Sequence, residues 1–425
     1  MQDFIYNEQG ELLAENVKIS AIAATIGTPF YCYSSSTINK LCSYYHAAFK
    51  PIGEYLIAYA VKANSNQAII SQLGELGCGA DIVSHGELKR AIHAKINPQK
   101  IIFSGVGKSI EEIDHALQLN IGCFNIESKA ELELLAQRAA FLAIEARISI
   151  RVNPNIDAKT HPKIATGMSH NKFGIELCQA LALYEYAAKL AYIKICGIDV
   201  HIGSQIRDLT PFGEAFHVIN QFIKELNAHN IELAHVDIGG GLGIDYNKLG
   251  ADLEDKDNIE QYAKLAAKYF ANSGLKIICE PGRSLVGNAG ILVSSVLYSK
   301  KSYNKTFIII DAAMNDLLRP TLYNAFQKII TVQQQPTRPK IHADIVGPVC
   351  ETGDYIAQDR EIEMVNNGEM LAILGAGAYG AVMASTYNSR LLIPEILVKD
   401  TQFAIIRPRQ SYQALLELDR LPPWQ

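Results

Sequence analysis

The eight cysteines of this chain are scattered through 425 residues, and no two of them stand at CxxC spacing. In a chain of this length, that pattern indicates reduced and mostly buried thiols rather than a disulfide framework or a zinc site. None of the eleven histidines forms HExxH or another compact metal motif. We therefore assign no metal from the sequence.

The printed sequence also shows no long apolar run, no basic run and no pattern of a secretory leader. No uncharged apolar run reaches the ~18 residues of a membrane span. The opening residues, MQDFIYNEQGELLAEN, carry acids and lack a basic segment before an apolar core, so we expect no secretory signal. With a formal charge of -5 and no cluster of Lys or Arg, we expect neither nucleic acid nor a membrane as partner. The sequence predicts a soluble, cytoplasmic protein.

Short apolar runs recur through the first two thirds of the chain and alternate with stretches of helical periodicity, such as CQALALYEYAAKL. The runs are residues 55–61, 79–83, 100–104, 121–126, 146–152, 195–201, 234–239 and 276–280. Near-continuous apolar strands alternating with helices predict a parallel sheet covered on both faces. Eight such units over roughly 250 residues fit a closed (β/α)8 barrel of the TIM type. A doubly wound open sheet is the alternative.

The pattern changes after Gly282. Strand-like segments such as AGILVSSVLYSK, KTFIIIDAA, IHADIVGPVC, MLAILGAG and QFAIIRPRQ follow one another with little helix between them. This predicts a second, mostly antiparallel β-barrel or β-sandwich domain, which the early strand PFYCYS (29–34) joins. The expected domains are a barrel over residues 35–282 and a β domain made of residues 1–34 and 283–425.

The carboxyl ends of the predicted barrel strands carry polar residues and glycines. In order they are Lys62, Ser84, Gly105, Glu127, Asn153, His201, Gly239 to Gly241, and Glu280. Barrel enzymes place their chemistry at this end of the strands, so we expect the functional site here.

Each of these features also has a purely structural interpretation. Lys62 in YAVKAN could be the first solvated residue after a strand, and His201 a hydrogen-bonded structural side chain. The run GGGLG (239–243) could form a tight βα turn instead of a phosphate cradle. The acid and base of EPGR (280–283) could form a surface ion pair. GAGAYG (375–380) satisfies GxGxxG, but it lacks a second βαβ half, so we discount a dinucleotide site.

Taken together, a strand-end lysine, a histidine, a glycine run and a strand-end carboxylate are the parts needed to hold pyridoxal 5′-phosphate (PLP). The lysine would bond to the aldehyde, the glycines would bind the phosphate, and the carboxylate would keep the pyridine nitrogen protonated. An ordinary lysine, with a pKa near ~10.4, is almost entirely protonated at neutral pH, so a reactive one needs a special site.

A series of segments strengthens this hypothesis. They are YAVKAN, GADIVSHGE, NPNIDAKTHPKIATG, NKFGI, HIGSQ, DIGGGLGI, EPGRSLVG, MNDLLRPTLY, GPVCETGD and GAGAYG, in order from residue 59 to residue 380. With them the chain resembles the fold-type III, PLP-dependent decarboxylases. Within that family it is most similar to the branch that converts meso-2,6-diaminopimelate to L-lysine and CO2, the last step of lysine biosynthesis.

The resemblance implies a role for each matching residue. Lys62 would be the Schiff-base lysine, His201 would stack on the cofactor ring, and Glu280 would face the pyridine nitrogen. The cofactor-binding set would be Lys62, His201, Ser204, Gly240, Gly241, Glu280, Gly282, Arg283 and Tyr379. The barrel plus β domain of the family agrees with the fold predicted from the strand pattern.

The resemblance further implies a homodimer with active sites shared across the interface. Cys350 of the partner chain would reprotonate the product carbon, so the catalytic set would be Lys62, His201, Glu280 and Cys350. Substrate would be held by Arg283, Arg319, Tyr323, Glu351 and Tyr379. The arginines would grip the distal carboxylate of diaminopimelate through paired hydrogen bonds. Glu351 would take the distal amine.

Three alternatives remain open at this stage. The first is a decarboxylase of ornithine, lysine or arginine, although the distal ammonium of ornithine or lysine would be repelled by two arginines. The second is an alanine-racemase-like enzyme, and the third is a binding protein without activity. Two positions depart from the family pattern: His85 stands where small residues are typical, and Thr352 replaces the serine of CESGD.

Overall fold

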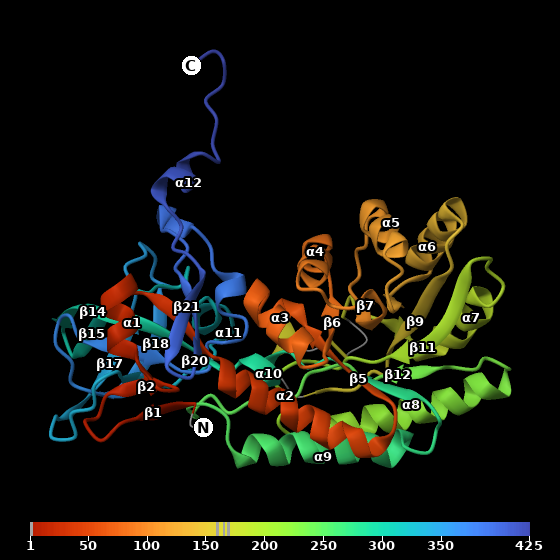
Figure 1. The fold of residues 1–425 in the computed structure, drawn as a ribbon, viewed down its shortest axis with the longest axis horizontal. Coiled ribbons are helices and arrows are strands. Elements are labelled where there is room, and N and C mark those ends of the chain that lie inside the picture. Colours follow the sequence, from red (N-terminus) through yellow and green to blue (C-terminus); the bar gives the residue numbers. More distant parts are fainter. Residues whose placement is uncertain (1–2, 159–160, 165, 168–170) are drawn as a thin grey trace. The chain divides into compact units, whose positions relative to one another are not determined.

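The computed structural model describes residues 3–158, 161–164, 166–167 and 171–425 (Figure 1). The chain forms two compact units. The first, here called the barrel unit, comprises Leu41–Ile244 and Asp252–Leu285. The second, here called the β unit, comprises Met1–Lys40, Asp245–Ala251 and Val286–Gln425. The domain borders expected from the sequence, after residues 34 and 282, remain predictions.

The barrel unit is built on a closed ring of parallel strands. They are β5 (Tyr55–Ala60), β6 (Gly79–Ile82), β7 (Ile101–Phe103), β8 (Cys123–Ile126), β9 (Ala146–Asn153), β11 (Ile193–Asp199), β12 (His235–Asp237) and β13 (Lys276–Cys279). The ring closes because β13 pairs with β5 and β8 pairs with β9, all in parallel register. A two-residue strand, β10 (Ile175–Glu176), adds to β9. Each predicted apolar run overlaps one strand of the ring, so the prediction of a (β/α)8 barrel is confirmed.

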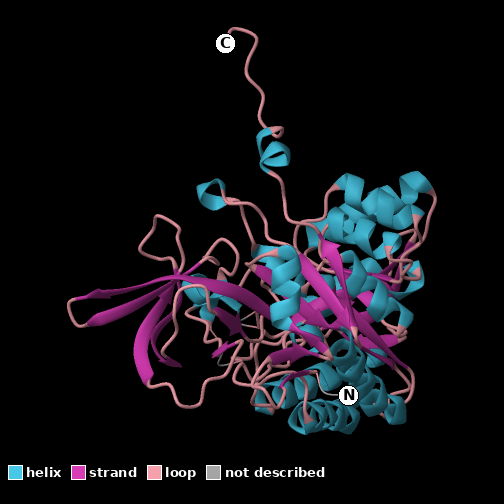
Figure 2. Cartoon of the chain, turned by 60° about the vertical axis from the view of Figure 1, so that its left-hand side comes forward, coloured by secondary structure: helices cyan, strands magenta, loops and turns pink. Residues whose placement is uncertain are grey.

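Helices surround this ring, as Figure 2 shows with cyan helices flanking magenta strands. They are α2 (Ser35–Phe49), α3 (Gln67–Glu75), α4 (His85–His93), α5 (Ile110–Gln118), α6 (Lys129–Leu142), α7 (Leu177–Ala187), α8 (Thr210–Ala228), α9 (Leu253–Phe270) and the short α10 (Arg283–Val286). Several begin at a side-chain cap, because an Asn or Ser oxygen accepts one of the unpaired N–H groups of the first turn. The caps are Asn66, Ser84, Ser109 and Ser128.

The inside of the barrel contains a buried polar chain near the amino ends of its strands. His235 of β12 and Ser149 of β9 are joined by a 2.7 Å hydrogen bond, and the Ser149 hydroxyl lies 3.2 Å from the Cys123 thiol. Burial lowers the pKa of His235 to about 4, with a further contribution from the charge of Lys276. His235 is therefore neutral in the folded protein at neutral pH.

This histidine makes stability depend on pH in a defined direction. The unfolded chain binds a proton at His235 as the pH falls through ~6.5, whereas the folded chain does so only near pH 4. Between these values the unfolded state binds a proton at His235 that the folded state does not, so this residue alone should lower the unfolding free energy by roughly 3 kcal/mol on acidification. Because the pKa of Asp199, raised to about 7, acts in the opposite direction over the same range, the loss is measured as the difference between denaturant titrations of the wild type and of a His235 variant from pH 7 to pH 4.

The matched comparison is His235→Gln, with His217→Gln on α8 as a control at an exposed histidine. His235→Gln should unfold with a shallower dependence on pH, whereas the control should follow the wild type. An unchanged pH dependence in His235→Gln would show that another group titrates here.

The β unit contains a large, mostly antiparallel sheet, as the sequence predicts. Its strands are β4 (Phe30–Ser34), β14 (Gly290–Ser302), β15 (Lys305–Ile310), β16 (Ile329–Thr331), β17 (Lys340–Val346), β18 (Tyr355–Glu363), β19 (Met370–Ile373), β20 (Glu395–Lys399) and β21 (Gln402–Arg407). Among the described strands of this sheet, only the pairs β15–β17 and β4–β20 are parallel. The predicted early strand is β4, which lies between β14 and β20.

Further elements complete the β unit. A three-stranded sheet precedes the first helix, and short helices lie late in the chain. They are β1 (Phe4–Tyr6), β2 (Leu12–Ala14), β3 (Val17–Lys18), α1 (Ile19–Ile26), α11 (Arg319–Tyr323) and α12 (Tyr412–Leu416). Alternate residues of the large sheet, such as Phe30, Cys32, Ile291 and Val293, pack with Ile22 in one apolar core. Among the residues described, no helix is long and apolar enough to cross a membrane.

Candidate active site

Lys62 lies on the carboxyl-terminal rim of the barrel. It follows β5 directly, in a short turn of 3-10 helix (Val61–Ala63). Its ammonium forms an ion pair with the carboxylate of Asp81, which is fully buried at the end of β6. About a third of the lysine side chain, 34%, is exposed. Lys62 is therefore held by a buried acid and is more than the first solvated residue after a strand.

Three further carboxyl groups gather on the same rim. Asp199, Asp237 and Glu280 are buried, and their oxygens lie within 4.8 Å of one another. Burial raises the pKa of Asp199 to about 7 and raises the pKa values of Asp237 and Glu280 well above their usual range. The negative charges of neighbouring acids add to this effect. Ionising all of these carboxyl groups together is therefore unfavourable at neutral pH. A cation bound beside them would stabilise their charged forms.

A buried arginine partly balances these acids. Arg151 donates to Glu127 at 2.9 Å, and its Nε lies 3.8 Å from Asp199. Glu127 also accepts the N–H groups of Gly105 at 3.1 Å and Gly174 at 2.9 Å. These contacts join the rim ends of β8, β9 and β11.

His201 lies beside the glycine run and is neutral. Its Nδ1 accepts the N–H of Gly240 at 3.1 Å, so the ring proton belongs on Nε2. Burial is the main cause that lowers the pKa of His201 well below its usual range, and the charges of Arg151 and Lys62 contribute. The glycine loop therefore fixes both the tautomer and the orientation of this ring.

The glycine run is a tight βα turn packed against the strand end that carries Glu280. Gly239 and Gly241 have φ values of +64° and +102°, which strain residues with a side chain. A Cβ at Gly240 would lie 2.2 Å from the carbonyl oxygen of Glu280. GGGLG is thus a tight βα turn in which the N–H groups of Gly239 and Gly240 already donate to Asp237 and His201, and its part in binding a phosphate remains a prediction.

Arg283 and Ser204, two residues expected around the phosphate, lie together. The Arg283 Nη2 donates to the Ser204 hydroxyl at 3.0 Å, and the arginine side chain is buried. Gly282 lets this segment approach the end of β5 closely, since a Cβ there would lie 3.1 Å from that of Ala60. The EPGR segment is therefore part of the rim and is not a surface ion pair.

The other expected residues belong to the β unit, where two of the sequence motifs meet. Arg319 and Tyr323 begin and end α11, and the Arg319 guanidinium lies 4.7 Å from the ring centre of Tyr246. The Thr321 hydroxyl donates to the carbonyl of Gly353 at 2.7 Å. This bond ties the RPTLY helix to the GPVCETGD loop.

Asp354 organises that loop. Its carboxylate accepts the N–H groups of Met314 and Val349, both at 2.7 Å. Burial raises the pKa of Asp354, while these two backbone hydrogen bonds lower it. The MNDLL and GPVC segments are consequently fixed by one buried acid.

Cys350 and Glu351 are exposed on this loop. The Cys350 N–H donates to Asn388 at 2.9 Å, and the hydrogen bond and charge of Glu351 raise the pKa of Tyr387. Tyr379 has a φ of +54°, an unusual conformation for a residue with a side chain. Its motif, GAGAYG, follows the antiparallel strand β19 and leads into a 3-10 turn, so the context of a dinucleotide site is absent there.

Sequence reasoning missed the acids Asp81, Asp199 and Asp237. Each lies inside an otherwise apolar strand, within GADIV, ICGIDVH and AHVDIG. A carboxylate in a strand buried on both faces is rare unless it is paired, and that was the available signal. The motif NPNIDAKTHPKIATG includes residues 159, 160 and 165, which lie outside the described residues.

His85, which departs from the family pattern, points away from this constellation. Its Nε2 lies 2.8 Å from Nδ1 of His115 on α5, and its Nδ1 lies 3.6 Å from Glu111. The contacts join α4 to α5 on the outside of the barrel. His85 is thus a helix-packing residue in this chain.

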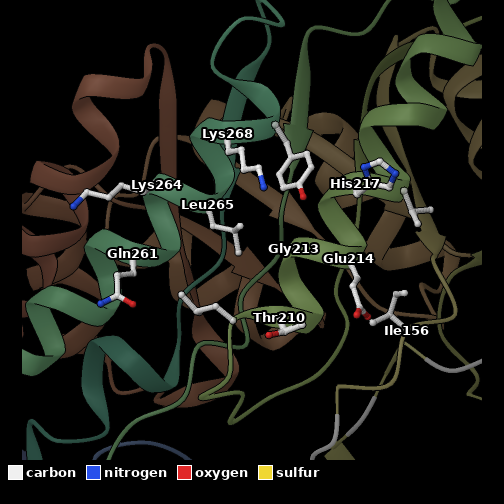
Figure 3. A pocket seen from close by; sticks show the side chains of 12 residues that line it. Ile156, Thr210, Gly213, Glu214, His217, Gln261, Lys264, Leu265 and Lys268 are labelled. Carbon is white, nitrogen blue, oxygen red and sulfur yellow. The ribbon is translucent and has the colours of Figure 1, made fainter.

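A groove in the barrel unit is a separate feature. It has a volume of about 940 Å3 and lies between α8 and α9, lined among others by Thr210, His217, Gln261 and Lys268 (Figure 3). None of the expected site residues lines it. The groove therefore does not compete with the rim as the candidate active site.

The residues of the rim fit PLP. Glu280 Oε1, Asp199 Oδ1 and Asp237 Oδ2 are buried without a hydrogen-bond partner among the described residues. Such acids would gain from a protonated ring nitrogen, and Arg283 with Ser204 offers donors for a phosphate. Lys62 provides the amine.

Comparison with known proteins agrees with this geometry. The family described as pyridoxal-dependent decarboxylase, pyridoxal binding domain, matches residues 35–287. The chain therefore belongs to the pyridoxal-dependent decarboxylases. It is 48% identical to the diaminopimelate decarboxylase of Aquifex aeolicus over 97% of each chain. Within the family, it is a member of the diaminopimelate decarboxylases.

Solved structures give the same result. The diaminopimelate decarboxylase of Helicobacter pylori, in complex with L-lysine, is 44% identical with a TM-score of 0.88, covering 94% of this chain and 98% of that one. The enzyme from M. jannaschii, also with L-lysine, is 35% identical with a TM-score of 0.92 over 100% of both chains. The fold predicted from sequence is thus shared over the whole chain.

Proposed function

We propose that this chain removes CO2 from meso-2,6-diaminopimelate to give L-lysine, with PLP as cofactor and in a cytoplasmic homodimer. The observation that carries the proposal is the rim itself, where Lys62 is held by Asp81 beside a cluster of buried acids. The relatives solved with L-lysine, the product of this reaction, support it.

Each rim residue has a defined task. Lys62 would bond to the cofactor aldehyde, and Arg283 with Ser204 would hold the phosphate. Glu280 would accept the protonated ring nitrogen, because a cation there would offset the burial and repulsion that raise the pKa of this acid. His201, neutral and fixed by Gly240, would pack against the ring. When bound, PLP supplies an electron-poor ring that stabilises the negative charge left when CO2 departs.

Cys350 returns a proton to the carbon that has lost CO2. Its thiol is exposed on the β unit, and we place it in the active site of the partner chain. Apolar side chains exposed on the β unit support a second copy as the partner, among them Tyr298 at 62% and Ile405 at 53% exposure. Arg319 binds the distal carboxylate of the substrate, and Glu351 binds the distal amine.

A substrate panel tests this assignment. We expect CO2 release from diaminopimelate and little from ornithine, lysine or arginine, because those substrates lack the distal carboxylate. Arg319→Gln should lower kcat/KM for diaminopimelate by about 10- to 100-fold, the loss of roughly 1.5–3 kcal/mol for a hydrogen bond to a charged group. The other substrates should change little.

Arg138→Gln is the matched control. Arg138 lies on α6 in an ion pair with Asp114, on the outer helices of the barrel unit. It should leave kcat/KM unchanged. Preferential release of CO2 from ornithine or lysine by the wild type would contradict the substrate assignment.

A further inference from the structure

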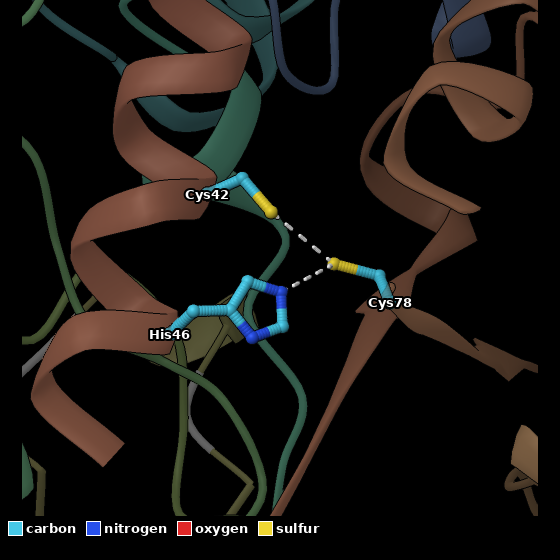
Figure 4. A group of neighbouring side chains, drawn as sticks. All are labelled: Cys42, His46 and Cys78. Carbon is cyan, nitrogen blue, oxygen red and sulfur yellow. Dashed lines mark hydrogen bonds between the residues drawn. The ribbon is translucent and has the colours of Figure 1, made fainter. Parts of the chain in front are cut away.

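A second cluster of reactive side chains lies in the barrel unit, at the opposite ends of the strands from Lys62. Cys42 and His46 lie one turn apart on α2, and Cys78 immediately precedes β6 (Figure 4). The two sulfur atoms are 3.4 Å apart, and Cys78 Sγ lies 3.9 Å from Nε2 of His46. Both thiols are buried, at 1% and 2% exposure.

These distances match the edges of a tetrahedral metal site. Two thiolates bound at ~2.3 Å to one tetrahedral zinc ion lie about 3.8 Å apart, and a thiolate and an imidazole nitrogen about 3.5 Å apart. The ligand atoms of Cys42, His46 and Cys78 all lie within 4.8 Å of one another. Small side-chain shifts are enough to place one ion among them.

A hydrogen bond of His46 orients its ring for binding a cation. The Nδ1 of His46 lies 3.1 Å from the hydroxyl of Tyr55, a contact that leaves Nε2 directed at the thiols. Hydrogen bonding of a metal-bound imidazole through its other nitrogen is the usual support of such a ligand.

We propose that Cys42, His46 and Cys78 bind one thiophilic divalent ion such as Zn2+. Among the described residues no other His, Cys, Asp or Glu joins the three, so the fourth position is left to water or another small ligand. Cys78 stands at the start of β6, whereas Asp81 and Lys62 lie at the rim. The ion would therefore tie α2 to β6 and would not take part in decarboxylation. Sequence analysis assigned no metal because these ligands share no compact motif.

An oxidised pair is the main alternative, since two thiols at this distance could also form a disulfide. A disulfide would make no use of His46, although Tyr55 orients this ring so that its Nε2 lies 3.9 Å from Cys78 Sγ. The three-residue arrangement therefore favours the metal.

Titration of the reduced, chelator-treated holoenzyme with Co2+ under anaerobic conditions tests the proposal. We expect one equivalent to bind with thiolate-to-cobalt charge-transfer absorption that Zn2+ then bleaches. Cys42→Ser and Cys78→Ser should each weaken that absorption, and the double variant should abolish it. Cys178→Ser, a change at an exposed cysteine on α7, should leave it intact.

Loss of absorption in the variants supports the proposal only if their circular dichroism spectra match that of the wild type. The wild-type titration tests the proposal without the variants. A wild type that gives no charge-transfer band would overturn the proposal, as would a band that survives in the double variant. Peroxide-induced loss of two hydrogens in a protein that binds no Co2+ would identify the cluster as a redox dithiol instead.

Discussion

Lys62→Ala should abolish CO2 release from diaminopimelate. The variant loses the only group in the proposed mechanism that bonds to the cofactor aldehyde, and it leaves Asp81 buried without its cation. Lys62→Arg separates these two effects, because a guanidinium keeps the charge opposite Asp81 but is never deprotonated in proteins. Both variants should fall below detection in a CO2-release assay, whereas Lys62→Arg should keep more of the wild-type stability.

Lys264→Ala provides the control for this series. Lys264 is 77% exposed on α9 and should be replaceable without loss of turnover. Activity in Lys62→Arg comparable to that of the wild type would mean that Lys62 acts only through its charge. That result would contradict a covalent role.

Cys350→Ser should lower kcat by about 10²- to 10⁴-fold, the usual contribution of a positioned proton donor. A serine hydroxyl fills nearly the same space but gives up its proton far less readily than a thiol. KM should change little, because Arg319 and Glu351 remain. Cys178 is the other exposed cysteine among the described residues, and it lies in the barrel unit. Cys178→Ser should have the kcat of the wild type.

Mixing of inactive chains tests whether Cys350 acts in the partner. Lys62→Ala and Cys350→Ser chains, dissociated and reassembled together, should regain about a quarter of wild-type activity, because half of the dimers then contain one intact shared site. No recovery in verified mixed dimers would place Cys350 in the same chain as its Lys62.

The barrel was predictable from sequence because each of its strands is buried on both faces and is therefore nearly continuous in apolar residues. GADI and KIIC show this pattern clearly, and both are strands of the ring. Several of the strands that were missed have a different character. β18, YIAQDREIE, is half polar, and β1 to β3 are only two or three residues long, so pairing partners far along the chain define them.

The residues of the candidate site also include some that the sequence predicts and some that it does not. Lys62, His201 and Glu280 were predictable because they stand where apolar runs end. Asp81 and Asp199 were not predictable, because their place in the site depends on the acidic and basic side chains that closure of the barrel brings next to them. The pairing of Cys42 with Cys78 likewise depends on how α2 packs beside β6.

Borohydride reduction of the holoenzyme, followed by peptide mass spectrometry, addresses the covalent role of Lys62 most directly. Reduction fixes the bond between the cofactor and its amine, and the added mass should map to the peptide that contains YAVKAN, on Lys62, with one cofactor per chain. A reduced cofactor on another lysine, or on none, would contradict the proposed mechanism.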